Sequence, residues 1–183
     1  EFKVTAGTLT INDAGGAVGD STILNTGTLE VIGDGATLGA ATLEIDNTHI
    51  NSNHTLQASA FGQLVLNGTD VANSYDPGTG TVAGDVNVLD TNSELDLTAA
   101  TITGGKLTND GTVGSSGASF LTSVATSNHL GDLLKVTGGE LQISAGSVAN
   151  AGTLRADGGT LDLESVTVTN SIGANKGTID VTA

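Results

Sequence analysis

Short alternations of aliphatic and polar residues run along the whole chain. An aliphatic residue, one other residue and a second aliphatic residue recur many times, for example at Leu43/Ile45, Leu64/Leu66, Leu95/Leu97 and Leu141/Ile143. A period of two places both aliphatic side chains on the same face of an extended strand. Only residues 120–134 come near the spacing of an amphipathic helix, and there we expect one short helix. The pattern predicts an all-β protein built from many short strands.

A second pattern is a turn motif, Asn-x-Gly-Thr followed by an aliphatic residue. Its four copies begin at Asn25, Asn109, Asn150 and Asn175. The first two copies begin 84 residues apart and the second and third begin 41 apart, close to four and two units of about 21 residues. The last interval, 25 residues, fits one unit with a small insertion. Internal periodicity of this length is typical of solenoid proteins.

Three short strands in each unit of about 20–21 residues describe a single-stranded parallel β-helix, also called a β-solenoid. Stacking its turns about 4.8 Å apart buries the apolar face and pairs the backbone groups of neighbouring turns. We expect about nine turns, with the four motif asparagines stacked as a ladder in which each amide bonds to the next turn. The alternative is a β-sandwich of the immunoglobulin type, which has short strands but needs no turn motif at multiples of one spacing.

Residues 1–183 are expected to form one β-solenoid domain that is a fragment of a longer protein. Two stretches interrupt the rhythm of the repeat. Residues 67–85 contain the only Tyr and the only Pro of the chain, and residues 114–132 contain Phe120 and His129. We expect both stretches to be loop insertions that protrude from the rod. In solenoids such insertions often form the recognition surface, and they are equally compatible with tolerated excursions.

Composition and charge exclude several classes of partner. The chain has 5 Lys and Arg against 20 Asp and Glu, a net charge of −15, so it lacks the basic face that nucleic acids and anionic lipids require. No stretch of 18 consecutive apolar residues is present, so no membrane insertion is expected. Cys is absent, which excludes disulfides, thiolate metal sites and a cysteine nucleophile. Because aromatic residues make up only 2%, the core must consist of Val, Ile, Leu and Ala.

Candidate catalytic groups are few. A serine hydrolase needs a nucleophile beside a histidine, and no Gly-x-Ser-x-Gly motif accompanies His49, His54 or His129. Asp157 and Asp162 could form the acid and base pair of a polysaccharide lyase or hydrolase, enzymes that β-helices also host. Because the cationic and aromatic residues that hold sugars are scarce, we expect a protein that is not an enzyme. A carbohydrate-active enzyme is the alternative.

One candidate metal site follows from the acidic residues. His49 and His54 lie five residues apart, so on one strand they would point to opposite faces and could not share a zinc ion. Five carboxylates stand between two aliphatic residues of a strand and should face solvent: Glu30, Glu44, Asp96, Asp162 and Asp180. If these strands share a sheet, an acidic stripe runs along the rod, and calcium is the ion that suits it. We favour an acidic, solubilising face without a metal over this calcium site, which is the alternative, and no other cofactor is expected.

The segments 102–113, 143–163 and 168–181 resemble the degenerate repeats of pattern xGGxLxNxGTLxxxGGTLxL in large bacterial surface proteins. These proteins are filamentous-haemagglutinin-like adhesins, autotransporter passengers and giant type I-secreted adhesins. The resemblance implies export to the bacterial cell surface, a rigid stalk that packs against neighbouring repeats of the same chain, and attachment to host cells, surface proteins or matrix glycans, as in biofilms. A stalk that acts as a pure spacer, with no ligand, is a further alternative.

Overall fold

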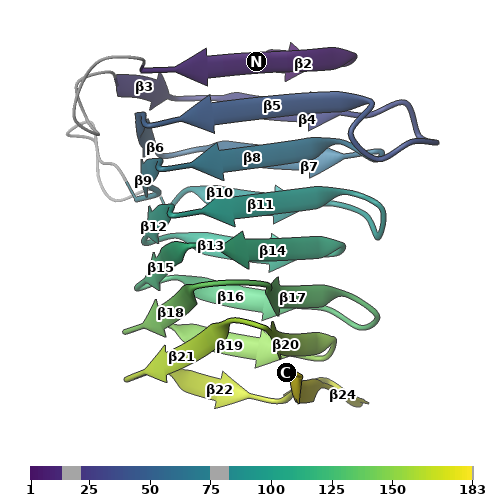
Figure 1. Ribbon diagram of the computed structural model, residues 1–183, viewed down its shortest axis with the longest axis vertical. Helices are drawn as coiled ribbons and strands as arrows, with labels where there is room; N and C mark the ends of the chain where they lie inside the picture. Colours follow the sequence, from purple (N-terminus) through teal and green to yellow (C-terminus); the bar gives the residue numbers. More distant parts are fainter. Residues whose placement is uncertain (14–21, 75–82, 183) are drawn as a thin grey trace.

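The computed structural model describes residues 1–13, 22–74 and 83–182. In this part the chain is all-β and coils into a rod of stacked turns, with the first strands at one end and the last strands at the other (Figure 1). Successive turns add one strand to each of three parallel sheets, which we name A, B and C. The chain is therefore a β-solenoid, and the fold predicted from the alternation of aliphatic residues is confirmed.

The three sheets consist of short strands that follow one another in the order of the turns. Sheet A contains β1 (Phe2–Val4), β4 (Thr28–Ile32), β7 (Thr55–Ser59), β10 (Asp85–Val88), β13 (Lys106–Asn109), β16 (Ala125–Asn128), β19 (Ser147–Asn150) and β22 (Thr167–Thr169). Sheet B, which faces the viewer in Figure 1, contains β2 (Gly7–Asn12), β5 (Ala41–Asp46), β8 (Gln63–Asn67), β11 (Glu94–Thr98), β14 (Thr112–Ser116), β17 (Leu133–Val136), β20 (Thr153–Asp157) and β25 (Thr178–Thr182). Sheet C contains β3 (Thr22–Asn25), β6 (His49–Ser52), β9 (Asp70–Ala72), β12 (Thr101–Thr103), β15 (Ala118–Thr122), β18 (Glu140–Ser144) and β21 (Thr160–Glu164).

The last turn contains a small antiparallel hairpin, in which β23 (Ser171–Ile172) pairs with β24 (Asn175–Lys176). This hairpin accounts for the spacing of 25 residues between Arg155 of β20 and Asp180 of β25, which are adjacent in register. All strand pairs of sheets A, B and C in the described residues are parallel. The two facing antiparallel layers of an immunoglobulin-like sandwich are therefore excluded for this part of the chain.

The core is a continuous stack of aliphatic side chains inside the rod. In sheet C, for example, one inward column contains the fully buried side chains of Ile50, Val71, Ile102, Leu121 and Ile143. Neighbouring strands are about 4.8 Å apart, so each side chain rests on the equivalent side chain of the next turn. Burial of a side chain of this size stabilises the fold by about 1.5–3 kcal/mol. A single column thus links the stability of each turn to that of its neighbours.

The length of a turn changes along the rod. Near the amino terminus Glu30 is paired in register with Gln57, which follows it by 27 residues, whereas the ladder asparagines described below are 19, 22 and 20 residues apart. The expected repeat of about 20–21 residues therefore holds in most of the later turns and in one early turn, where His49 is in register with Asp70, 21 residues later. Other early turns are longer. Because several early turns are longer, sheets A and B contain eight strands each within the described residues, compared with the expected number of about nine turns. The additional residues lie in connections such as 33–40, between β4 and β5.

A ladder of asparagines runs through the corner at which sheet A passes into sheet B. Asn109 Nδ2 donates to Asn128 Oδ1 (2.7 Å) and Asn128 Nδ2 donates to Asn150 Oδ1 (2.8 Å). Asn150 Nδ2 in turn donates to Asn170 Oδ1 (2.7 Å). The amides also bond to the backbone of the turns, as Asn128 Nδ2 does to the carbonyl oxygen of Thr153 (3.1 Å). The expected ladder is present, but only two of its members belong to the four motif asparagines.

Asn25 and Asn175 lie outside this ladder. Asn25 ends β3, at the corner between sheets C and A, where its Nδ2 donates to Ser52 Oγ (3.1 Å). Asn175 is exposed in the inserted hairpin, and Asn170 occupies the ladder position in its place. The Asn-x-Gly-Thr motif therefore marks a tight turn that is used at two different corners. For this reason the 84 residues between Asn25 and Asn109 are not a whole number of turns.

Neither expected loop is an insertion over its full length. Residues 114–132 contain β15 and β16, which pair with the neighbouring turns like other strands, and residues 120–134 contain no helix. Leu121 is fully buried while Phe120 is 37% exposed, which is the alternation of a strand. In residues 67–85, Asn67 ends β8 and residues 70–72 form β9. The remainder of that stretch includes residues 75–82, which lie outside the described residues.

Candidate functional site

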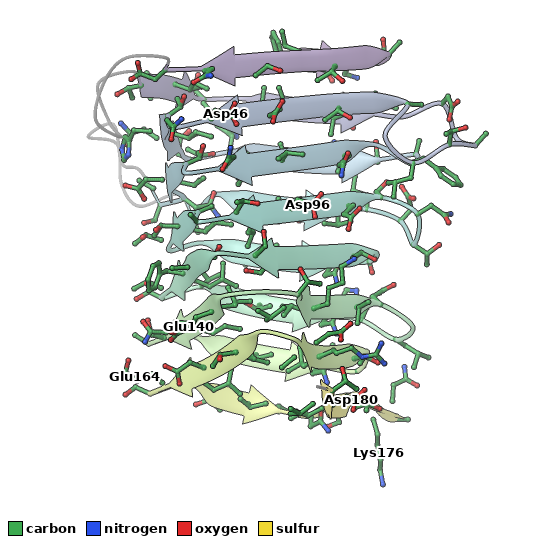
Figure 2. The ribbon with its side chains drawn as sticks, viewed as in Figure 1. Asp46, Asp96, Glu140, Glu164, Lys176 and Asp180 are labelled. Atoms are coloured by element: carbon green, nitrogen blue, oxygen red, sulfur yellow. The ribbon has the colours of Figure 1, made fainter. Side chains whose placement is uncertain are left out.

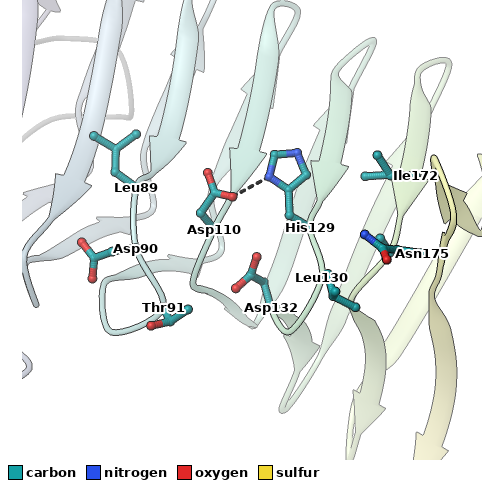
Figure 3. A pocket seen from close by; sticks show the side chains of 10 residues that line it. Leu89, Asp90, Thr91, Asp110, His129, Leu130, Asp132, Ile172 and Asn175 are labelled. Carbon is teal, nitrogen blue, oxygen red and sulfur yellow. Dashed lines mark hydrogen bonds and ion pairs between the residues drawn. The ribbon is translucent and has the colours of Figure 1, made fainter.

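An open groove of about 590 Å³ runs along the corner between sheets A and B, outside the asparagine ladder (Figure 3). It extends from the connection between β10 and β11 to the β23–β24 hairpin. We call it the corner groove and define it by three polar and three apolar residues that line it: Asp110, His129, Asp132, Leu89, Leu130 and Ile172. The corner groove thus combines charged groups and aliphatic surface on one edge of the rod.

The ladder fixes the position of two groove residues. Asp110 follows Asn109 and His129 follows Asn128, so each side chain points outward where the asparagine before it points inward. Because Asn109 and Asn128 are paired in register, Asp110 and His129 lie on adjacent turns. His129 Nδ1 donates a hydrogen bond to Asp110 Oδ1, with 2.5 Å between the two atoms. The two side chains therefore form one polar unit that faces the groove (Figure 3).

Asp132 is a buried carboxylate that lines the groove. The residue is only 5% exposed, and no hydrogen bond or ion pair to its carboxylate occurs within the described residues. Burial raises the pKa of Asp132, the negative charge of Asp110 raises it further, and the nearby His129 opposes both effects. In Figure 3 the carboxylate points to the side of the groove on which Asp110 and His129 lie. Asp132 is thus a largely buried residue whose carboxylate faces the groove and, within the described residues, has neither a hydrogen bond nor an ion pair.

The neighbouring carboxylate of Asp90 has partners in the protein. Its Oδ2 accepts hydrogen bonds from the backbone N–H of Ala60 (2.6 Å) and from the hydroxyl of Ser93 (2.8 Å). Its Oδ1 accepts a hydrogen bond from the backbone N–H of Asn92 (3.1 Å). Asp90 therefore stabilises the connection between β10 and β11, and Asp110 and Asp132 are the carboxylates that remain for a ligand.

The apolar part of the groove is exposed. Leu130 is 63% exposed and Leu89 is 44% exposed, and Ile172 of the hairpin lies at the far end. Leu130 belongs to the connection 129–132 between β16 and β17, which is longer than the connection 110–111 between β13 and β14. Exposed apolar surface that is rimmed by polar residues is a common feature of binding surfaces. The groove therefore has the composition of a contact site.

The acidic stripe expected from the sequence does not form. Glu30 lies in sheet A and Asp162 in sheet C, and only Glu44, Asp96 and Asp180 share sheet B. Glu30 is also only 7% exposed, and it accepts a hydrogen bond of 2.6 Å from a glutamine of the next turn. The alternation of aliphatic residues predicts which side chains point outward, but it contains no information about which sheet each strand joins.

Within sheet B the carboxylates alternate with neutral and cationic residues. One outward column contains, in order, Glu44, Val65, Asp96, Gly114, Lys135, Arg155 and Asp180. Asp96 and Asp180 lie well apart along the rod (Figure 2), and Arg155 Nε donates to Asp180 Oδ2 (3.1 Å). Within the described residues no group of three or more His, Asp or Glu could hold a metal ion. The stripe that would suit calcium is thus replaced by a column of mixed charge.

A second hollow, of about 360 Å³, lies on sheet B where Gly114 has no side chain. Asp96 lines it, and burial, together with the charge of Glu94, raises the pKa of Asp96. Both carboxylates have partners, because Gln63 Nε2 donates to Asp96 Oδ2 (2.7 Å) and Lys135 Nζ lies 3.4 Å from Glu94 Oε1. Since both carboxylates of this hollow have partners within the protein, the corner groove is the stronger candidate for a site.

The carboxylate pair considered for a carbohydrate-active enzyme is divided between two sheets. Asp157 ends β20 of sheet B, and Asp162 lies in β21 of sheet C. Asp157 Oδ1 accepts a hydrogen bond from the hydroxyl of Thr182 (3.3 Å), and Asp162 Oδ2 accepts one from Gln142 Nε2 (3.2 Å). The two carboxylates thus have separate partners on separate faces of the rod.

The three histidines are also distributed over the rod. His49 on β6 has its Nδ1 3.2 Å from Asp70 Oδ2 and its Nε2 2.8 Å from Asn51 Oδ1. His54 is exposed in the turn before β7. His129 is the one histidine that lines the corner groove. The sequence therefore pointed to one groove residue, His129, which was considered for hydrolytic catalysis. It did not point to the two carboxylates beside it, those of Asp110 and Asp132.

No protein family, curated protein sequence or solved structure matches this chain. Among the residues that the structure describes, no helix has the length and apolar character needed to cross a membrane. The fold and the corner groove are therefore the observations that bear on function.

Proposed function

We propose that this chain is an adhesive stalk segment of a secreted or cell-surface bacterial protein. The observation that supports this function is the unbroken parallel ladder, in which eight successive strands of sheet A and eight of sheet B follow the rod. At about 4.8 Å per step, eight strands span about 34 Å. Because backbone hydrogen bonds and core columns run along this axis, each turn is held by the next and the segment is stiff.

The composition supports export. The chain contains no Cys, so it can cross a secretion channel unfolded without disulfides to reduce or reform. The net charge of −15 keeps it soluble and prevents association with anionic lipid. The likeness of residues 102–113, 143–163 and 168–181 to the repeats of bacterial adhesins supports the same conclusion.

The corner groove is the proposed adhesive surface. It lies on the edge of the rod, it crosses several turns, and it offers exposed leucine side chains. It also offers the carboxylate of the buried residue Asp132, which has no hydrogen bond or ion pair within the described residues. A stiff stalk holds such a surface in a fixed orientation, which lowers the entropy cost of contact with a cell surface or matrix. Surface proteins and matrix glycans are the ligand classes to test first.

Attachment of the purified chain to cells and to a glycan array tests this function. Beads that carry the native chain should bind at least one cell type or glycan, and the double variant Leu130→Gln/Asp132→Asn should bind much less. Asp162→Asn, on sheet C, removes one charge away from the groove and serves as the matched control. Failure of the native chain to attach to any surface would leave a pure spacer and refute the adhesive function.

The same preparation can be assayed for polysaccharide breakdown. We expect no turnover, and the variants Asp157→Asn and Asp162→Asn should behave like the native chain. Robust turnover that either variant abolishes would overturn the proposal in favour of a carbohydrate-active enzyme.

A further inference from the structure

The corner groove has the chemistry of a receptor for positively charged side chains. We propose that it binds an extended segment of a partner protein that presents arginine or lysine side chains, an inference that rests on the proposed adhesive function and names its ligand class. Four observations support it: the unpaired charge of the groove, the burial of Asp132, the absence of a metal-binding arrangement from the described residues, and the length of the groove.

The charge of the groove is not neutralised by the protein. Asp110 interacts with His129, and within the described residues no Lys or Arg forms an ion pair with Asp110 or Asp132. The ion pairs of the Lys and Arg residues lie elsewhere, at Lys3 with Glu1 and Glu30, Lys135 with Glu94, and Arg155 with Asp180. Together with the net charge of −15, this leaves a negative groove that attracts a cationic group.

Asp132 points to a ligand independently of that charge. Asp132 is 95% buried as a residue, so its carboxylate has lost part of its hydration, and such groups are normally stabilised by hydrogen-bond donors or by an opposite charge. Within the described residues the Asp132 carboxylate has neither an ion pair nor a hydrogen bond. The side chain of Asp132 lines the groove, where a guanidinium or ammonium group can donate to it.

The remaining lining favours an organic cation over a metal ion. No group of three or more His, Asp or Glu in the described residues is arranged to hold a metal. Leu89, Leu130 and Ile172 offer aliphatic surface beside the carboxylates. Arginine and lysine place a charged head at the end of an aliphatic stem, so the stem can cover the leucines while the head reaches the carboxylates.

The length of the groove fits an extended peptide. It passes from Leu89, after β10, to Ile172, in the hairpin after β22, which is four steps along the rod. Four steps of about 4.8 Å span about 19 Å, the length of about six extended residues. Among the described residues no Phe, Tyr or Trp lines the groove. A neutral glycan would therefore find no large aromatic side chain to stack on, and it carries no positive charge to pair with the two carboxylates.

Fluorescence anisotropy with labelled peptides tests the inference. The probe is an eight-residue peptide of alternating arginine and serine, and the control probe is the same peptide with citrulline, which keeps the shape and removes the charge. We expect the native chain to bind the arginine peptide at least about tenfold more tightly than the citrulline peptide, since a hydrogen bond to a charged group contributes that much. Salt should weaken binding.

Variants assign the binding to the groove. Asp132→Asn and Asp110→Asn should each weaken binding of the arginine peptide about tenfold, whereas Asp162→Asn on sheet C should leave it unchanged. Leu130→Gln changes an exposed side chain, is not expected to disturb folding, and should weaken binding several-fold. Melting curves of all four variants show whether each is folded.

The results separate this inference from the proposed function. Equal affinity of Asp132→Asn, Leu130→Gln and Asp162→Asn would show that the peptide binds the acidic surface in general, and would overturn the inference. Binding of glycans or cells through the groove without binding of the arginine peptide would also overturn it, while the adhesive function would stand. Failure of cells, glycans and peptide alike would refute both.

Discussion

The asparagine ladder leads to a quantitative prediction for Asn128→Ala. Asn128 is fully buried, accepts a hydrogen bond from Asn109 (2.7 Å), and donates to Asn150 Oδ1 (2.8 Å) and to the carbonyl oxygen of Thr153 (3.1 Å). Alanine removes these three hydrogen bonds and a longer one, from Asn128 Nδ2 to the carbonyl oxygen of Asp132 (3.5 Å), and it can adopt the same backbone conformation. The substitution therefore isolates what the ladder contributes to stability.

The expected loss follows from these three contacts. A neutral hydrogen bond contributes about 1 kcal/mol, so the three together contribute about 3 kcal/mol. Alanine also leaves Asn150 Oδ1 buried without a donor, and one unsatisfied buried group costs about 1–3 kcal/mol. We therefore expect the free energy of unfolding to fall by about 4–6 kcal/mol, which for a chain of this length lowers the Tm by roughly 8–24 °C.

Urea titration followed by far-UV circular dichroism measures this loss. Asn87 is the matched control, because it points outward from sheet A and its side chain makes no hydrogen bond within the described residues. Asn87→Ala should change the free energy of unfolding by no more than about 0.5 kcal/mol. If Asn128→Ala proves as stable as Asn87→Ala, the ladder contributes nothing to stability and the reasoning from its hydrogen bonds is wrong.

Three further substitutions test the turns, the core and the groove. Gly139→Ala should destabilise the fold by at least about 2 kcal/mol in the same titration. Gly139 has a φ of 65°, and an added Cβ would lie 2.3 Å from the carbonyl oxygen of Gly117. The control is Gly138→Ala, which should leave stability unchanged because its Cβ would meet nothing within 4 Å. Thr126→Val should raise the free energy of unfolding by about 1 kcal/mol, because Thr126 Oγ1 is buried without a partner. Burial raises the pKa of Asp132, so the folded state binds its proton more tightly than the unfolded state does, and the charged carboxylate lowers stability at pH values above that pKa. Asp132→Asn should therefore raise the Tm at about pH 7, and the difference should vanish well below pH 4, where the carboxyl is protonated in both states. A stable Gly139→Ala, a destabilised Thr126→Val or a pH-independent effect of Asp132→Asn would contradict the corresponding argument.

The fold was predictable because its main determinant is local. Pairs such as Leu64/Leu66 and Leu95/Leu97 alternate with polar residues, and that period alone assigns their side chains to the inside of the rod. The spacing of turn motifs was less informative. Asn25 Oδ1 accepts a hydrogen bond from the N–H of Gly27, as Asn109 Oδ1 does from the N–H two residues later, although the two turns lie at different corners. The local geometry of a turn therefore does not determine at which corner of the coil the turn lies.

The corner groove was only partly predictable. A ladder of asparagines implies that the residues after them form an outward row, which is how Asp110 and His129 come to lie on adjacent turns. The position of Asp132 depends on the longer connection at 129–132, and sequence periodicity does not fix the path of a connection. The expected stripe failed for a related reason. Glu30 and Asp162 join sheets A and C instead of sheet B, and the assignment of a strand to a sheet depends on every connection before it.

Distances between spin labels would test the stacked coil most directly. The chain has no Cys, so cysteine pairs can be introduced and labelled without background. Lys3, Asn87 and Thr169 lie in one outward column of sheet A, with three steps from Lys3 to Asn87 and four from Asn87 to Thr169. At about 4.8 Å per step we expect distances of about 14 Å and about 19 Å for these two pairs, and about 34 Å for Lys3 with Thr169. A Lys3–Thr169 distance clearly shorter than the other two combined would show that the turns do not stack along one axis, and would contradict the account.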